Sequence, residues 1–137
     1  MKAIFLILFL WTSSCIYSQE TNISTPKITI KISLGETITI ENYHLKFAKV
    51  LEDSRCPKEV TCIWAGRAKV RVDVWKNEED ALIKELIFGQ VKQGESKDLT
   101  LVTSEEKIIK GYALKPYPSN EVPSDKREYE LLIIIKK

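Results

Sequence analysis

The stretch AKVRVDVW, residues 68–75, alternates strictly between apolar and polar side chains. Its three valines fall on one face of an extended chain, and its charged residues, Lys69, Arg71 and Asp73, fall on the other. A period of two is typical of a strand with one buried and one solvated face, because successive side chains point in opposite directions. This segment therefore predicts a strand that covers a hydrophobic core.

The same alternation recurs on both sides of this strand, and turn residues separate the segments. Around residue 47 the pattern changes phase, which indicates a bulge or bend before residue 53. Seven to eight short strands without a sustained helical period predict an all-β, antiparallel β-sandwich (Ig-like) or a small barrel. The candidate strands are 27–33, 36–41, 43–50, 68–75, 81–88, 97–102, 106–118 and 127–136.

One segment, residues 77–88, also fits a helix. Leu82 and Leu86 are spaced i, i+4, as are Ile83 and Ile87, so one helical face could carry all four. A strand preceded by a turn at 77–80 is the preferred interpretation, and a helix is the alternative.

The first twenty residues, MKAIFLILFLWTSSCIYSQE, have the layout of a secretory signal. Lys2 precedes a short apolar run, and small polar residues follow. We expect cleavage after Ser18, which leaves Gln19 as the new N-terminus. In the alternative, residues 12–15 resemble a bacterial lipobox and Cys15 carries lipid; a lipobox usually has Leu where this chain has Thr12. The expected location is secreted or periplasmic, or membrane-anchored through Cys15.

The remaining length suits one domain. Residues 1–18 are the expected signal peptide, 19–26 a flexible lead-in, and 27–137 a single β domain. No later apolar run reaches the roughly 20 residues that a bilayer span needs. The net charge of +2 provides no strong field for nucleic acid. We expect a monomer without a transmembrane span.

The chain has three cysteines, of which Cys15 leaves with the signal or takes lipid. Cys56 and Cys62 remain, and in an oxidising compartment a disulfide is their default state. A structural zinc site needs four Cys or His ligands, whereas the mature chain offers two cysteines and His44. The sequence therefore predicts a disulfide and no metal. Chain entropy gives this bridge a stabilising effect of about 2 to 2.5 kcal/mol.

The cysteines lie in the stretch DSRCPKEVTCIWAG, residues 53–66, which we call the cysteine loop. We expect Asp53 to accept hydrogen bonds from backbone N–H groups, and Arg55 to cap carbonyls or pair with an acid. Pro57 and the bridge restrict the loop. Gly66 supplies a backbone conformation that other residues resist.

Trp64 lies two positions beyond Cys62. Large aromatic side chains mostly serve burial, so we expect Trp64 to pack over the disulfide at the edge of the sandwich. The alternative is an exposed platform that stacks on a ligand.

The residues Asp53-Ser54-Arg55-Cys56-Pro57, then Cys62, Trp64 and Gly66, form a block that is followed late in the chain by Tyr112 and Pro116-Tyr117-Pro118. This pattern resembles a family of small exported bacterial β proteins and lipoproteins, and it spans about 34–133. The resemblance implies export, the bridge and one β domain. It names no substrate.

Enzyme signatures are absent from the sequence. There is one histidine, no G-x-S-x-G, no H-E-x-x-H and no glycine-rich phosphate loop. His44 shares a strand face with Lys46, which favours a solvated histidine. We therefore expect no catalytic residues and no cofactor.

A binding module fits the sequence better than an enzyme does. Trp75 and Arg71, on the outward face of their strand, and Tyr117 are the candidate binding residues. The expected partner is a protein, peptide or glycan in the envelope or outside the cell. A secreted protease inhibitor is the alternative, and a carboxylate-based hydrolase is a weaker one.

Overall fold

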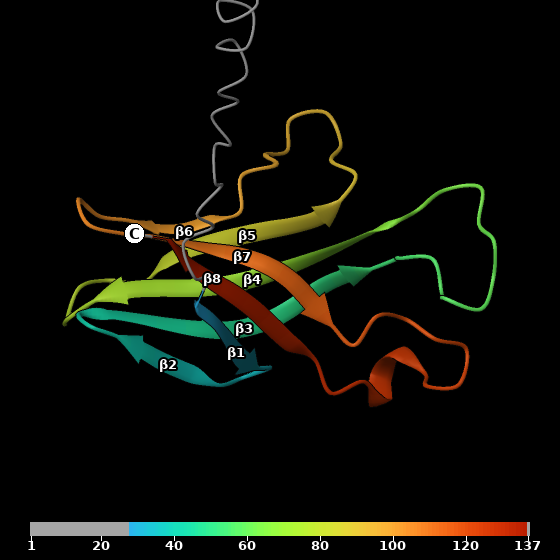
Figure 1. Cartoon of the computed structure of the whole chain (residues 1–137), viewed down its shortest axis with the longest axis horizontal. Coiled ribbons are helices and arrows are strands. Elements are labelled where there is room, and N and C mark those ends of the chain that lie inside the picture. The colour runs from blue at the N-terminus through green and yellow to red at the C-terminus, as the bar shows by residue number, and fades with distance from the viewer. Residues whose placement is uncertain (1–27, 137) are drawn as a thin grey trace, which may run out of the picture.

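The protein is a β-sandwich of two four-stranded antiparallel sheets, seen in a computed structural model that describes residues 28–136 (Figure 1). The expected signal peptide, Cys15 and the lead-in 19–26 lie outside the described residues. One sheet has the order β1-β8-β7-β6 and the other β2-β3-β4-β5. The elements are β1 (Ile28–Ser33), β2 (Thr37–Ile40), β3 (Tyr43–Asp53), β4 (Arg67–Lys76), β5 (Leu82–Gly89), β6 (Thr100–Thr103), β7 (Ile108–Lys115), the 3₁₀ turn η1 (Ser124–Lys126) and β8 (Glu130–Lys136).

The segment that also fitted a helix is a strand. β5 pairs antiparallel with β4 from Arg67↔Gly89 to Val74↔Leu82, and Asn77 begins the preceding turn with φ 51°. The i, i+4 spacing of the leucines and isoleucines in this segment therefore does not indicate a helix. The preferred interpretation, a strand preceded by a turn, is confirmed.

The core lies between the sheets, where the period of two placed it. The valines of β4 are buried, as are Leu45 and Phe47 of β3 and Ile133 of β8. The register between β3 and β4 shifts after Phe47 and again after Val50, which confirms the predicted bulge. β3 nevertheless continues to Asp53. The cysteine loop therefore starts at the last residue of this strand, and none of its residues belongs to the hydrophobic core.

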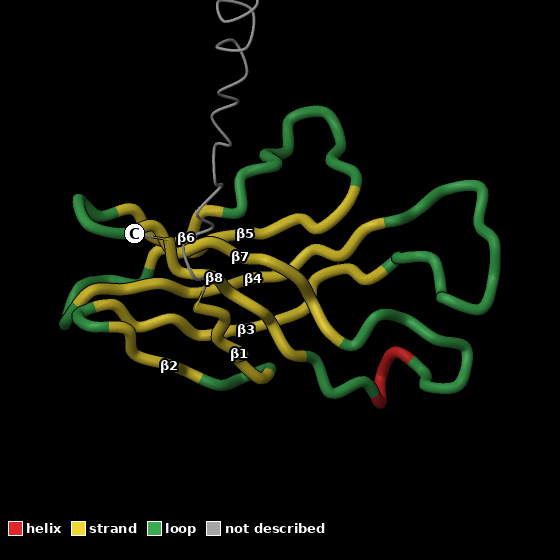
Figure 2. Tube along the Cα trace, in the orientation of Figure 1, coloured by secondary structure: helices red, strands yellow, loops and turns green. Residues whose placement is uncertain are grey.

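Two long connections meet at one end of the sandwich (Figures 1 and 2). The cysteine loop joins β3 to β4, and residues 116–129, which we call the β7–β8 loop, carry η1. The backbone N–H of Lys58 donates to the carbonyl of Pro118 at 3.2 Å and joins the two loops. This end of the molecule holds the candidate site.

Candidate functional site

The cysteine loop is a covalently closed hairpin tip. Cys56 and Cys62 form a disulfide with their Cα atoms 5.9 Å apart, which confirms the predicted bridge. The backbone of Cys56 donates to the carbonyl of Ala65 at 3.0 Å, so the two arms are also hydrogen-bonded. Pro57 lies inside the ring that the bridge closes and is itself partly buried. These constraints remove much of the freedom that a loop of this length would have.

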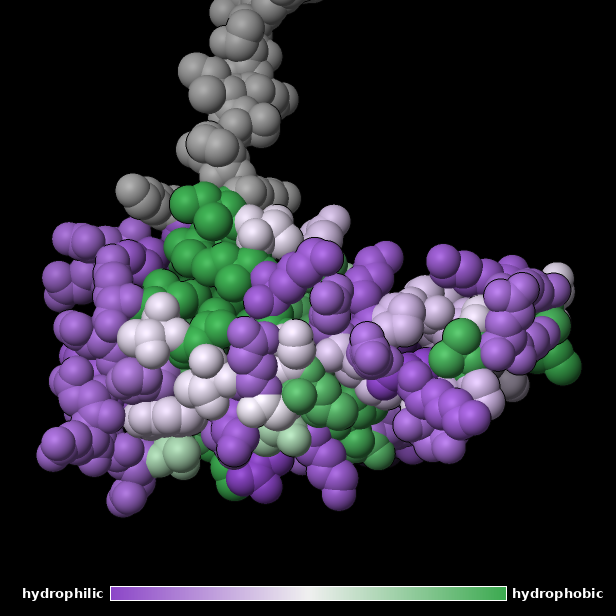
Figure 3. Space-filling model, turned by 90° about the horizontal axis from the view of Figure 1, so that it is seen from below, coloured by the Kyte–Doolittle hydropathy of each residue, from purple (hydrophilic) through white to green (hydrophobic). Residues whose placement is uncertain are grey.

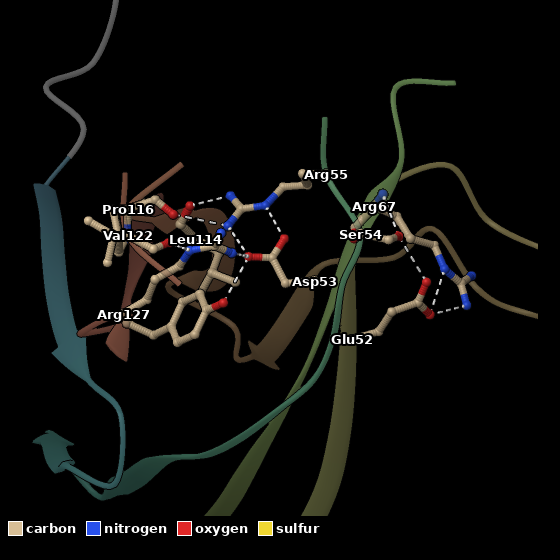
Figure 4. A network of polar contacts seen from close by, with 10 residues as sticks. Glu52, Asp53, Ser54, Arg55, Arg67, Leu114, Pro116, Val122 and Arg127 are labelled. Carbon is tan, nitrogen blue, oxygen red and sulfur yellow. Dashed lines mark hydrogen bonds and ion pairs between the residues drawn. The ribbon is translucent and has the colours of Figure 1, made fainter. Parts of the chain in front are cut away.

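A buried ion network anchors this loop to the sandwich (Figure 4). Arg55 donates from Nε and Nη2 to the two carboxylate oxygens of Asp53, at 2.7 and 2.8 Å, and both side chains are less than a tenth exposed. The same guanidinium donates to the carbonyls of Leu114 at 2.7 Å and Pro116 at 3.0 Å. Both expected roles of Arg55, carbonyl capping and pairing with an acid, are confirmed.

Asp53 is held mainly by side chains, where backbone N–H groups were expected. The hydroxyl of Tyr129 donates to its Oδ2 at 3.0 Å, and Nη1 of Arg127 lies 3.5 Å from the same oxygen. Burial alone would raise the pKa of Asp53, but the hydrogen bonds and charge of Arg55, with the Tyr129 hydroxyl, hold it below its ordinary value. Burial raises the pKa of Tyr129, and the neighbouring Asp53 carboxylate raises it further. The network is therefore an ionised acid among neutral and cationic donors.

A second ion cluster closes the stem of the hairpin. Arg67 donates from Nη2 to Glu52 at 2.7 Å, and its Nη1 is hydrogen-bonded to Glu95. The hydrogen bond from Arg67 is the largest cause that lowers the pKa of Glu52 from 4.5 to about 2. Ser54 and Arg67 exchange further bonds across the stem, including Ser54 N–H to the Arg67 carbonyl at 2.8 Å. Ion pairs therefore hold both arms of the hairpin, through Arg55 on one arm and Arg67 on the other.

Gly66 has the special backbone conformation that was predicted. Its φ is +69°, and an added Cβ would lie 1.8 Å from the carbonyl oxygen of Ser54. The close approach of the two hairpin arms therefore requires glycine here.

The predicted burial of Trp64 is wrong. Trp64 is 73% exposed and Ile63 is 94% exposed, and Val60 of the same loop is also exposed. The space beneath the loop is filled instead by the Arg55 network, by the fully buried Pro118 and by Tyr117, whose ring lies 5.0 Å from the Arg55 guanidinium. Small apolar areas lie among mostly polar atoms at the right-hand end of the molecule in Figure 3. The loop is therefore held against the sandwich and exposes two adjacent apolar side chains, Ile63 and Trp64, which we call the loop tip.

Two of the three candidate binding residues lie away from this site. Trp75 is half-buried on the outer face of β4 and stacks on His44, with ring centroids 5.3 Å apart. Arg71 pairs with Asp73 on the same face at 2.7 Å. Tyr117 is the candidate that the fold brings to the cysteine loop. His44 is also hydrogen-bonded to Thr39, so it is less solvated than expected.

Sequence reasoning missed Tyr129 and Arg127. They lie at the end of the β7–β8 loop and meet Asp53 across separations of 76 and 74 residues. No short motif links positions so far apart. The sequence placed Tyr129 within the expected strand 127–136, whereas β8 begins at Glu130. The alternation gave no sign that an acid lies beside the Tyr129 hydroxyl.

Within residues 28–136 no group of three or more His, Cys, Asp or Glu side chains is arranged to hold a metal ion. No helix in that range has the length and apolar character needed to cross a bilayer. Comparison of the chain with family models, curated proteins and solved structures finds no match. The resemblance to small exported β proteins stays a prediction.

Proposed function

We propose that the protein is an exported, non-enzymatic binding module whose cysteine loop presents Ile63 and Trp64 to a protein partner. The exposure of these adjacent side chains carries the proposal. Exposed apolar side chains lower the solubility of a protein, so clusters of them often mark interaction sites. Large aromatic residues are also enriched among those that contribute most of the binding energy at an interface. A loop already fixed by a bridge and two ion clusters also loses little conformational entropy when it binds.

The ion networks support a structural role rather than catalysis. Asp53 and Glu52 have lowered pKa values because guanidinium groups pair with them. A carboxylate kept ionised in this way is a poor general acid, and its buried oxygens are already occupied. Both clusters therefore fit the task of holding the loop.

The proposed location is outside the cytoplasm, either secreted or periplasmic. The leader-like first residues support it, and the Cys56–Cys62 bridge fits an oxidising compartment. Intact mass of protein recovered from its host tests the processing. A mass that starts at Gln19 is expected, and a lipid-modified Cys15 would instead establish the membrane-anchored form.

A protease-inhibitor version of this function is favoured by one observation: the braced loop projects outward from the sandwich (Figure 1). An inhibitor of this kind presents a rigid loop to an active-site cleft. This version predicts that the wild type inhibits a secreted protease and that Trp64→Ala no longer does. That result would favour a protease inhibitor over a general binding module.

The general proposal is tested by comparative capture from envelope and secretome extracts. The bait is the wild type, Ile63→Ser with Trp64→Ser, or the control Tyr112→Ser, which alters an exposed aromatic on another face. We expect a protein that the wild type and the Tyr112 variant retain and the tip variant loses. Retention by all three baits, each shown to be folded, would contradict a role for the tip.

A further inference from the structure

A groove of about 950 Å³ opens between the outer face of β1 and β8 and the β7–β8 loop. It lies over outward-facing positions of β1 and β8 and continues under the β7–β8 loop. Leu132 and Val122 give it apolar wall area, and four basic side chains line it: Lys31, Lys115, Lys126 and Arg127. The groove joins an apolar surface to a basic one.

Positive charge exceeds negative charge along this groove. Its four basic residues face two acids, Glu128 and Glu130, which leaves a formal balance of 4 − 2 = +2. Lys31 pairs with Glu130 at 3.4 Å. Over residues 28–136, no ion pair engages Lys115 or Lys126. Two lysines are therefore available to an incoming anion.

The base of the groove adds a guanidinium whose charge is only partly balanced. Arg127 shares Asp53 with Arg55, so this cluster holds two cations and one anion. Arg127 also donates from Nε to the carbonyl of Val122 at 3.2 Å, as Figure 4 shows. The Arg127 side chain is 10% exposed and lines the groove. It therefore adds positive charge at the base of the groove, where Lys115 and Lys126 are the more exposed cations.

We propose that this groove binds an acidic peptide segment, with Arg127, Lys115 and Lys126 receiving carboxylates and Leu132 and Val122 contacting an apolar side chain. Guanidinium and ammonium groups form charge-assisted hydrogen bonds with carboxylates. A peptide suits an open groove that is lined along two strands and a loop. Pro116 lines the groove, and the segment it begins contacts the cysteine loop through Pro118 and Lys58. A protein seated on the loop tip can thus extend an acidic segment into the groove.

The groove contains no residue of the loop tip. A model peptide therefore tests the groove separately from the proposed function of the tip. The probe is a fluorescent six-residue peptide that alternates glutamate and leucine, titrated into the mature protein and followed by anisotropy. We expect saturable binding that weakens with added salt. Lys115→Gln with Lys126→Gln should weaken it about tenfold, since each exposed charge contact contributes modestly.

Matched controls separate this site from general charge attraction. Lys46→Gln with Lys49→Gln removes two exposed lysines from β3 and should leave the peptide affinity unchanged. A peptide with glutamine in place of glutamate should bind at least tenfold more weakly. Equal losses in the two lysine pairs, equal affinity for the glutamine peptide, or no binding at millimolar peptide would each overturn the proposal. Circular dichroism confirms that every variant is folded, and Ile63→Ser with Trp64→Ser should bind the probe like the wild type.

Discussion

Gly66 is a residue of the cysteine loop at which the neighbouring backbone leaves no room for a side chain. Gly66→Ala should destabilise the protein by about 3 kcal/mol or more, because a Cβ would collide with the Ser54 carbonyl in addition to the strain of a positive φ. Gly35→Ala is the matched control, since Gly35 has φ +86° but nothing within 4 Å of the added atom. That variant should cost only about 1 to 2 kcal/mol. Urea unfolding measures both, and equal costs would contradict the close-contact argument.

Trp64 tests whether the loop tip serves stability or binding. Trp64→Ala should lower the free energy of unfolding by less than about 1 kcal/mol, because its side chain is 73% exposed. Phe47→Ala provides the buried comparison: Phe47 is fully buried, and its truncation should cost about 3 to 5 kcal/mol. Denaturant unfolding checks both variants. A cost for Trp64 near that of Phe47 would mean that the side chain packs on the loop.

At the scale of the element, the disulfide and the exposed Trp64 side chain should contribute independently to the free energy of unfolding. Cys56→Ser with Cys62→Ser should destabilise the protein by about 2 to 2.5 kcal/mol, from the loop entropy that the bridge removes in the unfolded chain. Because Trp64 extends into solvent, adding Trp64→Ala should give a cost within about 0.5 kcal/mol of the sum. Unfolding of the three variants measures this additivity, and a larger deviation would show that Trp64 contacts the bridge.

The hairpin stem should make stability depend on acid pH. The folded state lowers the pKa of Glu52 from 4.5 to about 2, so it binds fewer protons there than the unfolded chain does. The resulting stabilisation is complete above about pH 5 and is lost as pH falls from 4.5 towards 2. Asp53, whose pKa is also lowered, adds to the same trend. Urea midpoints between pH 7 and pH 2 should fall less in Glu52→Gln than in the wild type.

The control for this pH dependence is Glu106→Gln, which changes an exposed glutamate in the turn between β6 and β7. It should keep the wild-type profile. If Glu52→Gln keeps that profile as well, the Glu52–Arg67 pair does not stabilise the stem.

The strands and the bulge of β3 could be predicted from sequence because alternation reports directly which face of a strand is buried. The disulfide could be predicted because the cysteine count, together with the export expected from the first residues, left one pair. The partners of Asp53 could not, since Tyr129 and Arg127 meet it only after β7 and β8 pair. The exposure of Trp64 likewise depends on Pro118 and Arg55, which occupy the space beneath the loop.

At the scale of the whole molecule, the sandwich and its loop end are built differently. The core cluster draws on both sheets and contains no residue of 54–66; among the described residues of the β7–β8 loop it contains only Tyr129. The loop end is held by charge, backbone hydrogen bonds and the bridge. A binding surface built this way can change its exposed residues without altering the core, because Ile63 and Trp64 face solvent and do not belong to the core cluster.

This division predicts that the loop end can be loosened while the sandwich stays folded. In the wild type, hydrogen exchange should protect the amide of Lys58, which donates to Pro118, and the amides of the central strand β4. In Cys56→Ser with Cys62→Ser, the Lys58 amide should exchange at least tenfold faster, because local opening of the loop no longer has to stretch a closed ring. Under the same native conditions, Val70 and Val72, buried in the core, should stay protected well beyond Lys58, since global unfolding still limits their exchange. Residue-resolved exchange measured by NMR separates the two regions. Loss of protection at Val72 to the level of Lys58 would show that the bridge holds the sandwich together as well as its loop.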